Sequence, residues 1–579
     1  MNDPKDILRR ILAEAVRKVA PEASWVEIHL ERPKNPEHGD LASNIALQLS
    51  KEIRRKPREI ADLLLAATSD LLRDHELFEP LTIAGAGFLN TRLKPAAKLS
   101  IVHRVLAEGA GFGSARPAAP ERMLVEFVSA NPTGPLHVGH GRGAAYGASL
   151  AALLEFAGHD VTREFYVNDA GRQMDVLTLS VWLRYLQAHG SVVPFPEDGY
   201  RGDYVLQTAA RLGDAHVTRF VRDAGALPQA AEGADPDAAL DQLIAAAKRL
   251  LGEDDWRLLH RFALDELLAD QRDDLAQFRV EFDGWFSEQS LYDTGAVART
   301  VERLSAAGHL YEKDGALWFR STSYGDEKDR VVRRENGQYT YFASDIAYHA
   351  DKFERGYGRL IDVWGADHHG YIPRVKGALK SLGLPAERFT VALVQFAVLY
   401  RGGEKVAMGK RSGDFVTLRE LRDEVGNDAA RFFYVMRKSD QHLDFDLDLA
   451  KSESQDNPVY YVQYAHARVC SVFSQWGGDP ARLERVPLAP LEHPRELALM
   501  QRLGEFPELV QSAARELAPH SIAFYLRELA GEFHSYYNAE RILVEDEALR
   551  AARLALCAAV RQVLANGLAL VGVSAPEKM

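Results

Sequence analysis

One stretch near residue 130 constrains the fold and the chemistry of this chain more than any other. It runs Ser129-Ala-Asn-Pro-Thr-Gly-Pro-Leu-His-Val-Gly-His-Gly-Arg142, between an apolar run at 123–128 and a helical pattern that continues to about Glu155. A strand, a glycine-rich turn and a helix N-terminus in this order direct backbone N–H groups and the positive end of the helix dipole toward an anion. His137 and His140 add donors to a phosphate. The stretch therefore predicts a nucleotide site built for reaction.

The composition is typical of a soluble globular protein of three or four domains. The chain has 579 residues, 46% of them hydrophobic and 26% charged. No run of 18 apolar residues occurs, so we expect no membrane-spanning helix, and the first residues lack the apolar core of a signal peptide. Two cysteines fit a reducing cytoplasm and are too few for a cysteine zinc cluster. The net charge of −13 argues against a nucleic-acid partner unless local patches override it.

The order of apolar runs predicts an α/β fold with a Rossmann-like parallel sheet in the middle of the chain. Strand patterns at 123–128, 161–167, 360–364 and 391–399 alternate with helical ones. We expect an α+β N-terminal domain at 1–112, a catalytic domain at 118–448 and an all-α bundle at 449–579. A mostly helical stretch at about 178–283 is predicted to be an insertion in the catalytic domain. Five basic residues within 51–58 fit either a solvated helix end or a phosphate contact.

Two further segments follow later strands and are expected near the same sheet edge. In Trp364-Gly-Ala-Asp-His-His-Gly-Tyr371 the carboxylate of Asp367 can bind a ribose hydroxyl, although a turn with incidental histidines is an alternative. In the segment 401–414 flanking glycines and the cations Lys405, Lys410 and Arg411 favour a loop that closes over a polyphosphate. An ordinary exposed basic loop is the commoner outcome for such a run.

These motifs, in this order, resemble those of class I aminoacyl-tRNA synthetases. His137-Val-Gly-His140 resembles the "HIGH" signature, and Ala407-Met-Gly-Lys-Arg411 resembles a variant of "KMSKS". The arginyl-tRNA synthetase form is matched most specifically, by segments 130–140, 166–171, 365–371 and 460–468. The resemblance extends from the N-terminal domain to the terminal bundle. It implies an ATP-dependent arginine–tRNA ligase without an editing domain.

The resemblance implies roles for individual residues, which we state as expectations. His137, His140 and Lys410 are the expected catalytic residues. The expected ATP-binding residues are Pro132, Gly134, His137, Gly139, His140, Gly365, Asp367, His368, Met408, Lys410 and Arg411. The expected arginine-binding residues are Ser129, Asn131, His140, Glu288, Tyr341 and Asp345. A guanidinium needs opposed carboxylates, and the spacing of Tyr341 and Asp345 places both on one helical face; for Glu288 and Asp345 an ordinary surface or paired carboxylate is the alternative.

The same resemblance implies that the N-terminal domain touches the tRNA elbow and that the terminal bundle binds the anticodon. The expected tRNA-binding residues are Phe88, Asn90, Tyr460, Tyr464, Arg468, Tyr537 and Arg541. For about half of these tyrosines, a place in the helix-packing core is the alternative. No protein-bound metal and no tightly bound cofactor are expected, with Mg²⁺ entering as the ATP counter-ion. We expect a monomer in the cytoplasm.

One departure from the signature concerns the basic loop. Ala407 stands where the first lysine of the signature is usual, and Lys405 or Arg401 are the candidates to replace its charge. A need for tRNA in the activation step is consistent with this weakened signature and is an expectation to be tested.

Three other functions fit parts of the sequence. A different adenylate-forming enzyme, or a synthetase for another amino acid, shares the histidine motif. A non-catalytic RNA-binding relative would lack His137, His140 or Lys410, and all three are present. A dinucleotide-dependent oxidoreductase ranks last, because no Gly-x-Gly-x-x-Gly with a suitably placed acid follows the first strand.

Overall fold

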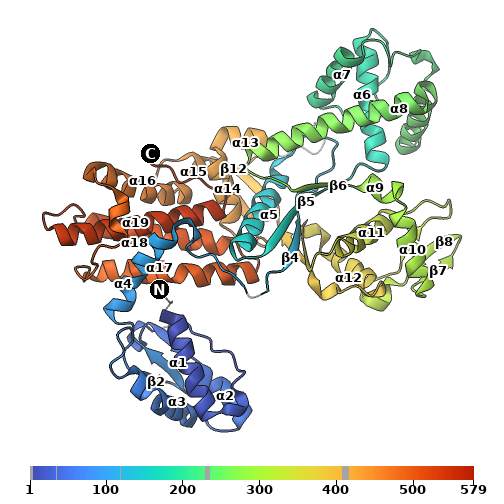
Figure 1. The fold of residues 1–579 in the computed structure, drawn as a ribbon. Coiled ribbons are helices and arrows are strands. Elements are labelled where there is room, and N and C mark those ends of the chain that lie inside the picture. Colours follow the sequence, from blue (N-terminus) through green and yellow to red (C-terminus); the bar gives the residue numbers. More distant parts are fainter. Residues whose placement is uncertain (1–3, 34, 118, 229–234, 407–415) are drawn as a thin grey trace.

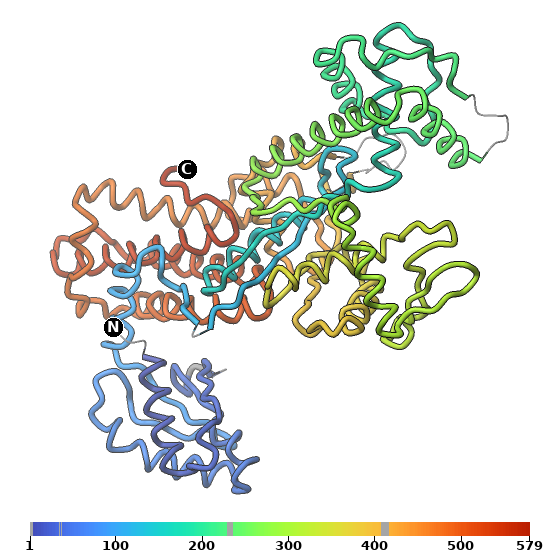
Figure 2. Tube along the Cα trace, turned by 45° about the vertical axis from the view of Figure 1, so that its right-hand side comes forward, coloured from blue at the N-terminus to red at the C-terminus, as the bar shows by residue number. Residues whose placement is uncertain are grey.

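The computed structural model describes residues 4–33, 35–117, 119–228, 235–406 and 416–579. It has a small N-terminal unit, a central unit built on a parallel sheet, and a C-terminal helical bundle (Figure 1). A helical insertion projects from the central unit on the side away from the N-terminal unit, and Figure 2 shows the same arrangement after a 45° turn. The predicted fold class is confirmed.

The N-terminal unit packs three helices against a small antiparallel sheet of order β1-β3-β2. Its own buried cluster includes Leu12, Leu49, Leu64 and Phe78. Its elements are α1 (Pro4–Val19), β1 (Leu41–Ser43), α2 (Ile45–Ile53), α3 (Pro57–Leu72), β2 (Thr82–Ala84) and β3 (Phe88–Thr91).

The next helix, α4 (Pro95–Glu108), packs on the C-terminal bundle instead. Ile101, Val102 and Val105 belong to the large cluster that the bundle shares with the central sheet. In packing terms the N-terminal unit therefore ends before α4, whereas the sequence analysis expected it to extend to residue 112.

The central sheet has five parallel strands in the order β11-β10-β4-β5-β6. Its middle strand β4 is almost wholly buried, because helices cover both faces of such a sheet. The sheet strands are β4 (Arg122–Glu126), β5 (Asp160–Val167), β6 (Gly284–Ser287), β10 (Arg359–Gly365) and β11 (Phe389–Val394). All five run the same way, so the loops after them meet at one edge.

The single strand predicted at 391–399 is wrong. The structure divides it into β11 and β12 (Ala397–Arg401), and β12 belongs to another sheet of order β13-β12-β14. The break falls at Gln395, whose N–H donates to the carbonyl of Ser439 and whose carbonyl accepts from the buried Arg142. An apolar pattern alone cannot reveal that these two polar groups have tertiary partners.

The insertion is formed by three helices with a separate hydrophobic cluster that includes Trp182, Leu212 and Trp256. They are α6 (Arg172–Ala188), α7 (Asp203–His216) and α8 (Pro236–Gln277). The helix α8 changes direction at Gly252, whose φ of 77° is outside the helical region. Its second part returns to the central sheet (Figure 1).

The remaining central elements complete the walls around the sheet edge. An antiparallel sheet β7-β8-β9 flanks the helices that follow β6. These elements are α5 (Val138–Phe156), α9 (Glu288–Asp293), α10 (Ala296–Ala306), β7 (Leu310–Lys313), β8 (Ala316–Phe319), β9 (Arg330–Arg333), α11 (Tyr341–Glu354), α12 (Ile372–Ser381), β13 (Glu404–Lys405), α13 (Leu418–Val425), α14 (Asn427–Val435), β14 (Leu443–Asp446) and α15 (Leu447–Lys451).

Four long helices form the C-terminal bundle. Two of them begin with proline, whose missing N–H is tolerated in the first helical turn. The helices are α16 (Pro458–Trp476), α17 (Pro494–Arg515), α18 (His520–Ala539) and α19 (Glu547–Leu570). Of the helices in the described residues, α19 alone is long and apolar enough to cross a membrane, and 78% of its apolar window is buried inside the bundle.

Candidate active site

The two histidines lie where the loop after β4 enters α5, and they form the N-terminal cap of that helix. His137 Nδ1 accepts the N–H of Gly139 at 3.0 Å, and His140 Nδ1 accepts the N–H of His137 at 3.2 Å. The two rings are stacked with centroids 3.7 Å apart. Because each Nδ1 accepts, each neutral ring carries its proton on Nε2.

Burial keeps both imidazoles neutral. It lowers the pKa of His137, and it lowers the pKa of His140 to about 3, where the neighbouring His137 contributes as well. At neutral pH the pair therefore provides two N–H donors and no positive charge.

The loop between β4 and these histidines has a strained start. Val128 and Ser129 have positive φ values of 67° and 40°, which non-glycine residues adopt rarely. The Ser129 hydroxyl donates to Glu126 Oε1 at 2.9 Å and accepts the N–H of Tyr166 at 3.1 Å. Strand ends on both sides thus fix the backbone from which Asn131 projects.

Glu288 and Asp345 form an acidic pair beside this loop. Glu288 begins α9, directly after β6, and its Oε1 accepts the Ser344 hydroxyl at 2.8 Å. Asp345 lies on α11 and accepts the hydroxyl of Tyr371. Within the described residues no lysine or arginine forms an ion pair with either carboxylate. The donors that reach the pair are the neutral hydroxyls of Ser344 and Tyr371, while Lys352 and His349 favour the ionised Asp345 from a longer distance.

Burial makes the ionised form of both carboxyl groups less favourable, as their raised pKa values show. Burial, with the nearby Asp345 carboxylate, raises the pKa of Glu288 to about 7. Burial also raises the pKa of Asp345. A bound cation would reverse both shifts, since an opposite charge at close range favours the ionised carboxylate.

Asn168 connects the acidic pair with the loop at 127–137, between β4 and α5, which we call the histidine loop. Its side chain lies 3.1 Å from that of Asn131. In the amide orientation that satisfies its neighbours, Asn168 donates to Glu288 Oε2 at 2.6 Å. Contacts through Asn168 thus link Glu288, at the end of β6, with Asn131 in the loop that follows β4.

Tyr341 and Asp345 both lie on α11, one turn apart, which confirms their shared helix. Tyr341 is 56% exposed, and its hydroxyl lies 3.2 Å from the position that a Cβ on Gly171 would take. It stands at the rim of the acidic pair rather than beneath it. Ser344 and Tyr371 contact the acidic carboxylates directly, and the sequence analysis gave neither of them a role because a serine or a tyrosine alone has no pattern.

The segment after β10 reaches the same edge. Gly365 ends the strand, and Asp367 and His368 are exposed in the following turn, with His368 Nε2 3.6 Å from Asp367 Oδ2. Tyr371 from this turn holds Asp345, so the turn borders the acidic pair as well.

The other expected ATP-binding positions divide into two groups. Pro132 is buried, and Gly134 lies against Tyr204 of the insertion, 3.4 Å from the position of its absent Cβ. Met408, Lys410 and Arg411 are outside the described residues. Of the two candidates for the missing cation, Arg401 pairs with Glu424 at 2.7 Å, while Lys405 is exposed on β13.

The expected anticodon-binding residues form a ladder along α16 and α18. Tyr460 and Tyr464 stack with centroids 5.9 Å apart and planes 20° apart. The Arg468 guanidinium lies 4.5 Å from the centroid of Tyr464 and 4.9 Å from that of Tyr537. Arg541 is exposed beyond the end of α18.

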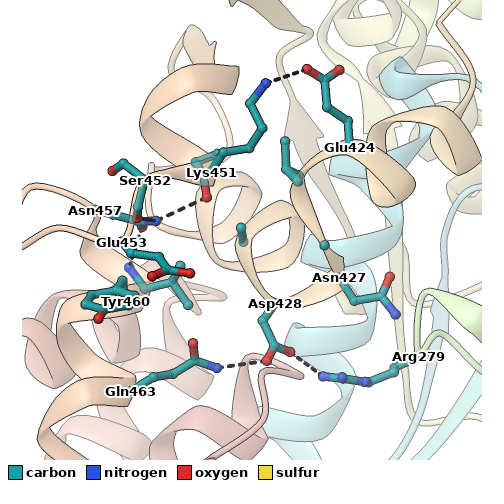
Figure 3. A pocket seen from close by; sticks show the side chains of 15 residues that line it. Arg279, Glu424, Asn427, Asp428, Lys451, Ser452, Glu453, Asn457, Tyr460 and Gln463 are labelled. Atoms are coloured by element: carbon teal, nitrogen blue, oxygen red, sulfur yellow. Dashed lines mark hydrogen bonds and ion pairs between the residues drawn. The ribbon is translucent and has the colours of Figure 1, made fainter. Parts of the chain in front are cut away.

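A polar cavity of about 520 Å³ opens beside Tyr460 (Figure 3). It lies between the α13–α14 turn and the start of α16, and Arg279, Asp428 and Gln463 line one side of it. It shares no lining residue with the histidine loop. It is therefore a feature of the junction between the central unit and the bundle.

In the N-terminal unit Phe88 is half-buried and Asn90 is 2% exposed, both on β3. The Oδ1 atom of Asn90 is buried and has no hydrogen-bond partner among the described residues. The basic run 51–58 spans the turn between α2 and α3, where Arg58 donates to the carbonyl of Gly85. No group of three metal-binding side chains occurs in the part of the chain that the structure describes.

Comparison with known proteins agrees with this geometry. The family model for the catalytic domain of tRNA synthetases class I (R) matches residues 102–196 and 247–448. Those for the arginyl tRNA synthetase N terminal domain and the DALR anticodon binding domain match residues 6–93 and 462–579.

Whole-chain relatives point the same way. The chain is 62% identical to the arginine–tRNA ligase of Azoarcus sp. and 60% identical to that of Dechloromonas aromatica, with full coverage of both chains in each case. Its fold is similar to that of the Thermus thermophilus arginyl-tRNA synthetase, with a TM-score of 0.75, 24% identity and full coverage of both chains. The chain belongs to the class I arginyl-tRNA synthetase family.

Proposed function

We propose that this chain attaches L-arginine to the 3′ end of its cognate tRNA with MgATP as the second substrate. The observation that carries the proposal is the acidic pair Glu288 and Asp345, which lacks a described counter-ion and is connected through Asn168 to the histidine loop. A planar cation and a nucleotide then bind side by side, as arginine activation requires.

The guanidinium of arginine is held between Glu288 and Asp345. A carboxylate accepts two parallel N–H bonds from a guanidinium, which a lysine ammonium cannot supply. Ser129, Asn131 and His140 orient the amino and carboxylate groups of the substrate, and Tyr341 covers the rim. Lysine leaves carboxylate oxygens unpaired in a buried pocket, at about 1–3 kcal/mol for each unmet group.

ATP lies along the histidine loop. The Nε2–H groups of His137 and His140 and the N-terminus of α5 donate to its phosphates. The missing side chains of Gly134 and Gly139 let the nucleotide approach the backbone closely, and Pro132 belongs to the same nucleotide-binding loop. Gly365, Asp367 and His368 hold the ribose and base end. Met408, Lys410 and Arg411 complete the site at the departing pyrophosphate, with Mg²⁺ arriving as part of the substrate.

The reaction has two transfers. A carboxylate oxygen of arginine attacks the α-phosphorus of ATP, the bond to the β-phosphate oxygen breaks, and pyrophosphate leaves. A 3′-terminal ribose hydroxyl of the tRNA then attacks the carbonyl carbon of arginyl-adenylate, gives up its proton, and displaces AMP. The two imidazoles stabilise charge at the phosphates, while positioning supplies most of the remaining rate.

The outer units bind the tRNA. Tyr460, Tyr464, Arg468, Tyr537 and Arg541 form the surface on which anticodon bases stack, since aromatic and guanidinium planes stack with any base. Phe88 and Asn90, both on β3, are assigned to the contact with the tRNA elbow. We place the corresponding domains at 1–112, 118–448 and 449–579, with α4 at the end of the first as the connection that packs on the bundle.

We further propose that the protein works as a monomer in a reducing cytoplasm. Cys470 and Cys557 are both free thiols, which supports a reducing cytoplasmic location.

ATP–pyrophosphate exchange tests the function. Purified protein is assayed with each of the twenty amino acids, with and without cognate tRNA. Of the twenty amino acids, we expect only arginine to support exchange. We expect that exchange only in the assays that contain tRNA. Exchange with another amino acid would reassign the substrate, and equal exchange with and without tRNA would reject the tRNA requirement.

A further inference from the structure

Gln271, on helix α8 of the insertion, contacts the histidine loop through its side-chain amide. Gln271 lies on the second part of α8 and is fully buried. Its Nε2 donates to the carbonyl of Gly134 at 2.9 Å and to the carbonyl of Asn131 at 3.1 Å. One side chain thus holds both ends of the Asn131–Gly134 segment, which leads directly into the histidines.

This segment has few other supports. Pro132 and Pro135 lack an N–H, and the loop begins with Val128 and Ser129 in the left-handed region. Within the described residues, the two carbonyls accept no hydrogen bonds other than those from Gln271. The loop conformation therefore depends on a donor located about 140 residues away in the sequence.

The amide oxygen of Gln271, unlike its nitrogen, makes no hydrogen bond to the described residues. This oxygen, Oε1, is buried. A buried acceptor without a partner is unfavourable, and methionine would fill similar space without one. In this structure the amide of Gln271 therefore acts through its two donor contacts.

Neighbouring residues on α8 hold the other side of the site. Asp270 pairs with Arg419 at 3.0 Å, and the buried Asp274 pairs with Arg422 at 2.5 Å. Both arginines lie on α13. Just before α13, the N–H of Val138 donates to the carbonyl of Val416, and the N–H of Leu418 donates to the carbonyl of Leu136. The second part of α8 therefore contacts both segments that border the histidines.

We propose that Gln271 is a positioning residue that fixes the Asn131–Gly134 segment, so that the helical insertion sets the geometry of the nucleotide site through α8. This inference rests on the proposed function. Gln271 touches no substrate and acts through the loop backbone. Without these two donors the loop backbone shifts. A shift of about 1 Å at a reacting group can cost about 100-fold in rate.

The test compares three variants of the full chain in ATP–pyrophosphate exchange with arginine and cognate tRNA. Gln271→Met removes the donors and keeps the size. Gln271→Glu keeps the shape and replaces the donor nitrogen by oxygen. Gln242→Met changes an exposed glutamine on the first part of the same helix and serves as the matched control. Melting temperature is measured for each variant.

We expect Gln271→Met to lower kcat by about 10- to 100-fold with a much smaller change in the KM for arginine, and Gln242→Met to match the wild type. Gln271→Glu should be at least as impaired at pH 8. Its rate relative to the wild type should rise as the pH falls toward 6, because the introduced carboxyl, once protonated, regains one donor for the loop carbonyls.

Wild-type turnover in Gln271→Met would overturn the proposal. If that variant does not fold, the pH response of Gln271→Glu decides, and a constant ratio to the wild type between pH 6 and pH 8 would overturn it. A wild-type protein without arginine-dependent exchange would reject the proposed function instead, whatever the variants do.

Discussion

Glu288 is the residue whose protonation links the structure to measurable kinetics. The free enzyme has to lose the Glu288 proton before a guanidinium binds, and burial has raised the pKa of this carboxyl to about 7. We expect kcat/KM for arginine to fall as the pH drops from 8 to 6, by up to about tenfold per pH unit below the pKa.

The matched variant is Glu288→Gln, which removes the titrating group. It should raise the KM for arginine by about 10- to 100-fold, which corresponds to one lost charge-assisted hydrogen bond, and it should flatten the pH dependence. A pH profile that is unchanged in this variant would assign the titration to another group.

The histidines give a prediction of the opposite kind. Because the pKa of His140 is lowered to about 3, its imidazole stays neutral from pH 6 to pH 9 and adds no inflection to the rate in that range. His140→Asn should lower kcat of ATP–pyrophosphate exchange by about 100- to 1,000-fold. The control is His442→Asn, which changes an exposed histidine directly before β14 and should retain full activity. Comparable losses in both variants would contradict the role of His140.

At the scale of single elements, α11 is tied to the sheet by buried charges. Lys352 is fully buried and donates to Glu126 on β4 at 2.6 Å and to Asp362 on β10 at 2.8 Å. His349 on the same helix contacts Asp362 at 2.8 Å. The helix that carries Tyr341 and Asp345 is therefore held by ion pairs that water does not screen.

We expect Lys352→Met to destabilise the central unit by about 3–5 kcal/mol, because it leaves two buried carboxylates without their cation. The matched control is Arg303→Met, which removes an exposed partner of Glu354 on the same helix and should cost at most about 1 kcal/mol. Urea unfolding of both variants measures the difference. Equal midpoints would show that the buried pairs contribute no more than the exposed one.

Several elements also show what the sequence can and cannot predict. The histidine loop was predictable because its strand, turn and helix cap are contiguous in the chain. The break at Gln395 was not, since it depends on Arg142 and Ser439 from distant segments. The role of Gln271 was not predictable for the same reason. It lies on a helix of the insertion, which has no recognisable motif, and its partner Gly134 is distant in the sequence.

At the scale of the whole molecule, the N-terminal unit meets the bundle through ion pairs. Lys5 and Arg9 pair with Glu508, and Arg32 pairs with Glu505 at 3.1 Å, both glutamates being on α17. Such partly exposed pairs are weak singly and are screened by salt. The orientation of this unit, which the proposed function assigns to the tRNA elbow, therefore depends on ionic strength.

We expect the Glu505→Gln/Glu508→Gln double variant to show an increased radius of gyration in small-angle X-ray scattering at low salt. The wild type should approach the same value as salt is added. Coincident scattering curves for wild type and variant at low salt would contradict the electrostatic docking of the N-terminal unit.

The central claim is that the acidic pair reads the guanidinium of arginine next to the histidine loop. A crystal structure of the chain with arginine and a non-hydrolysable ATP analogue tests it most directly. The account predicts guanidinium nitrogens about 2.8 Å from carboxylate oxygens of both Glu288 and Asp345, with the triphosphate on the His137 and His140 donors. Arginine bound elsewhere, with both carboxylates uncontacted, would contradict it.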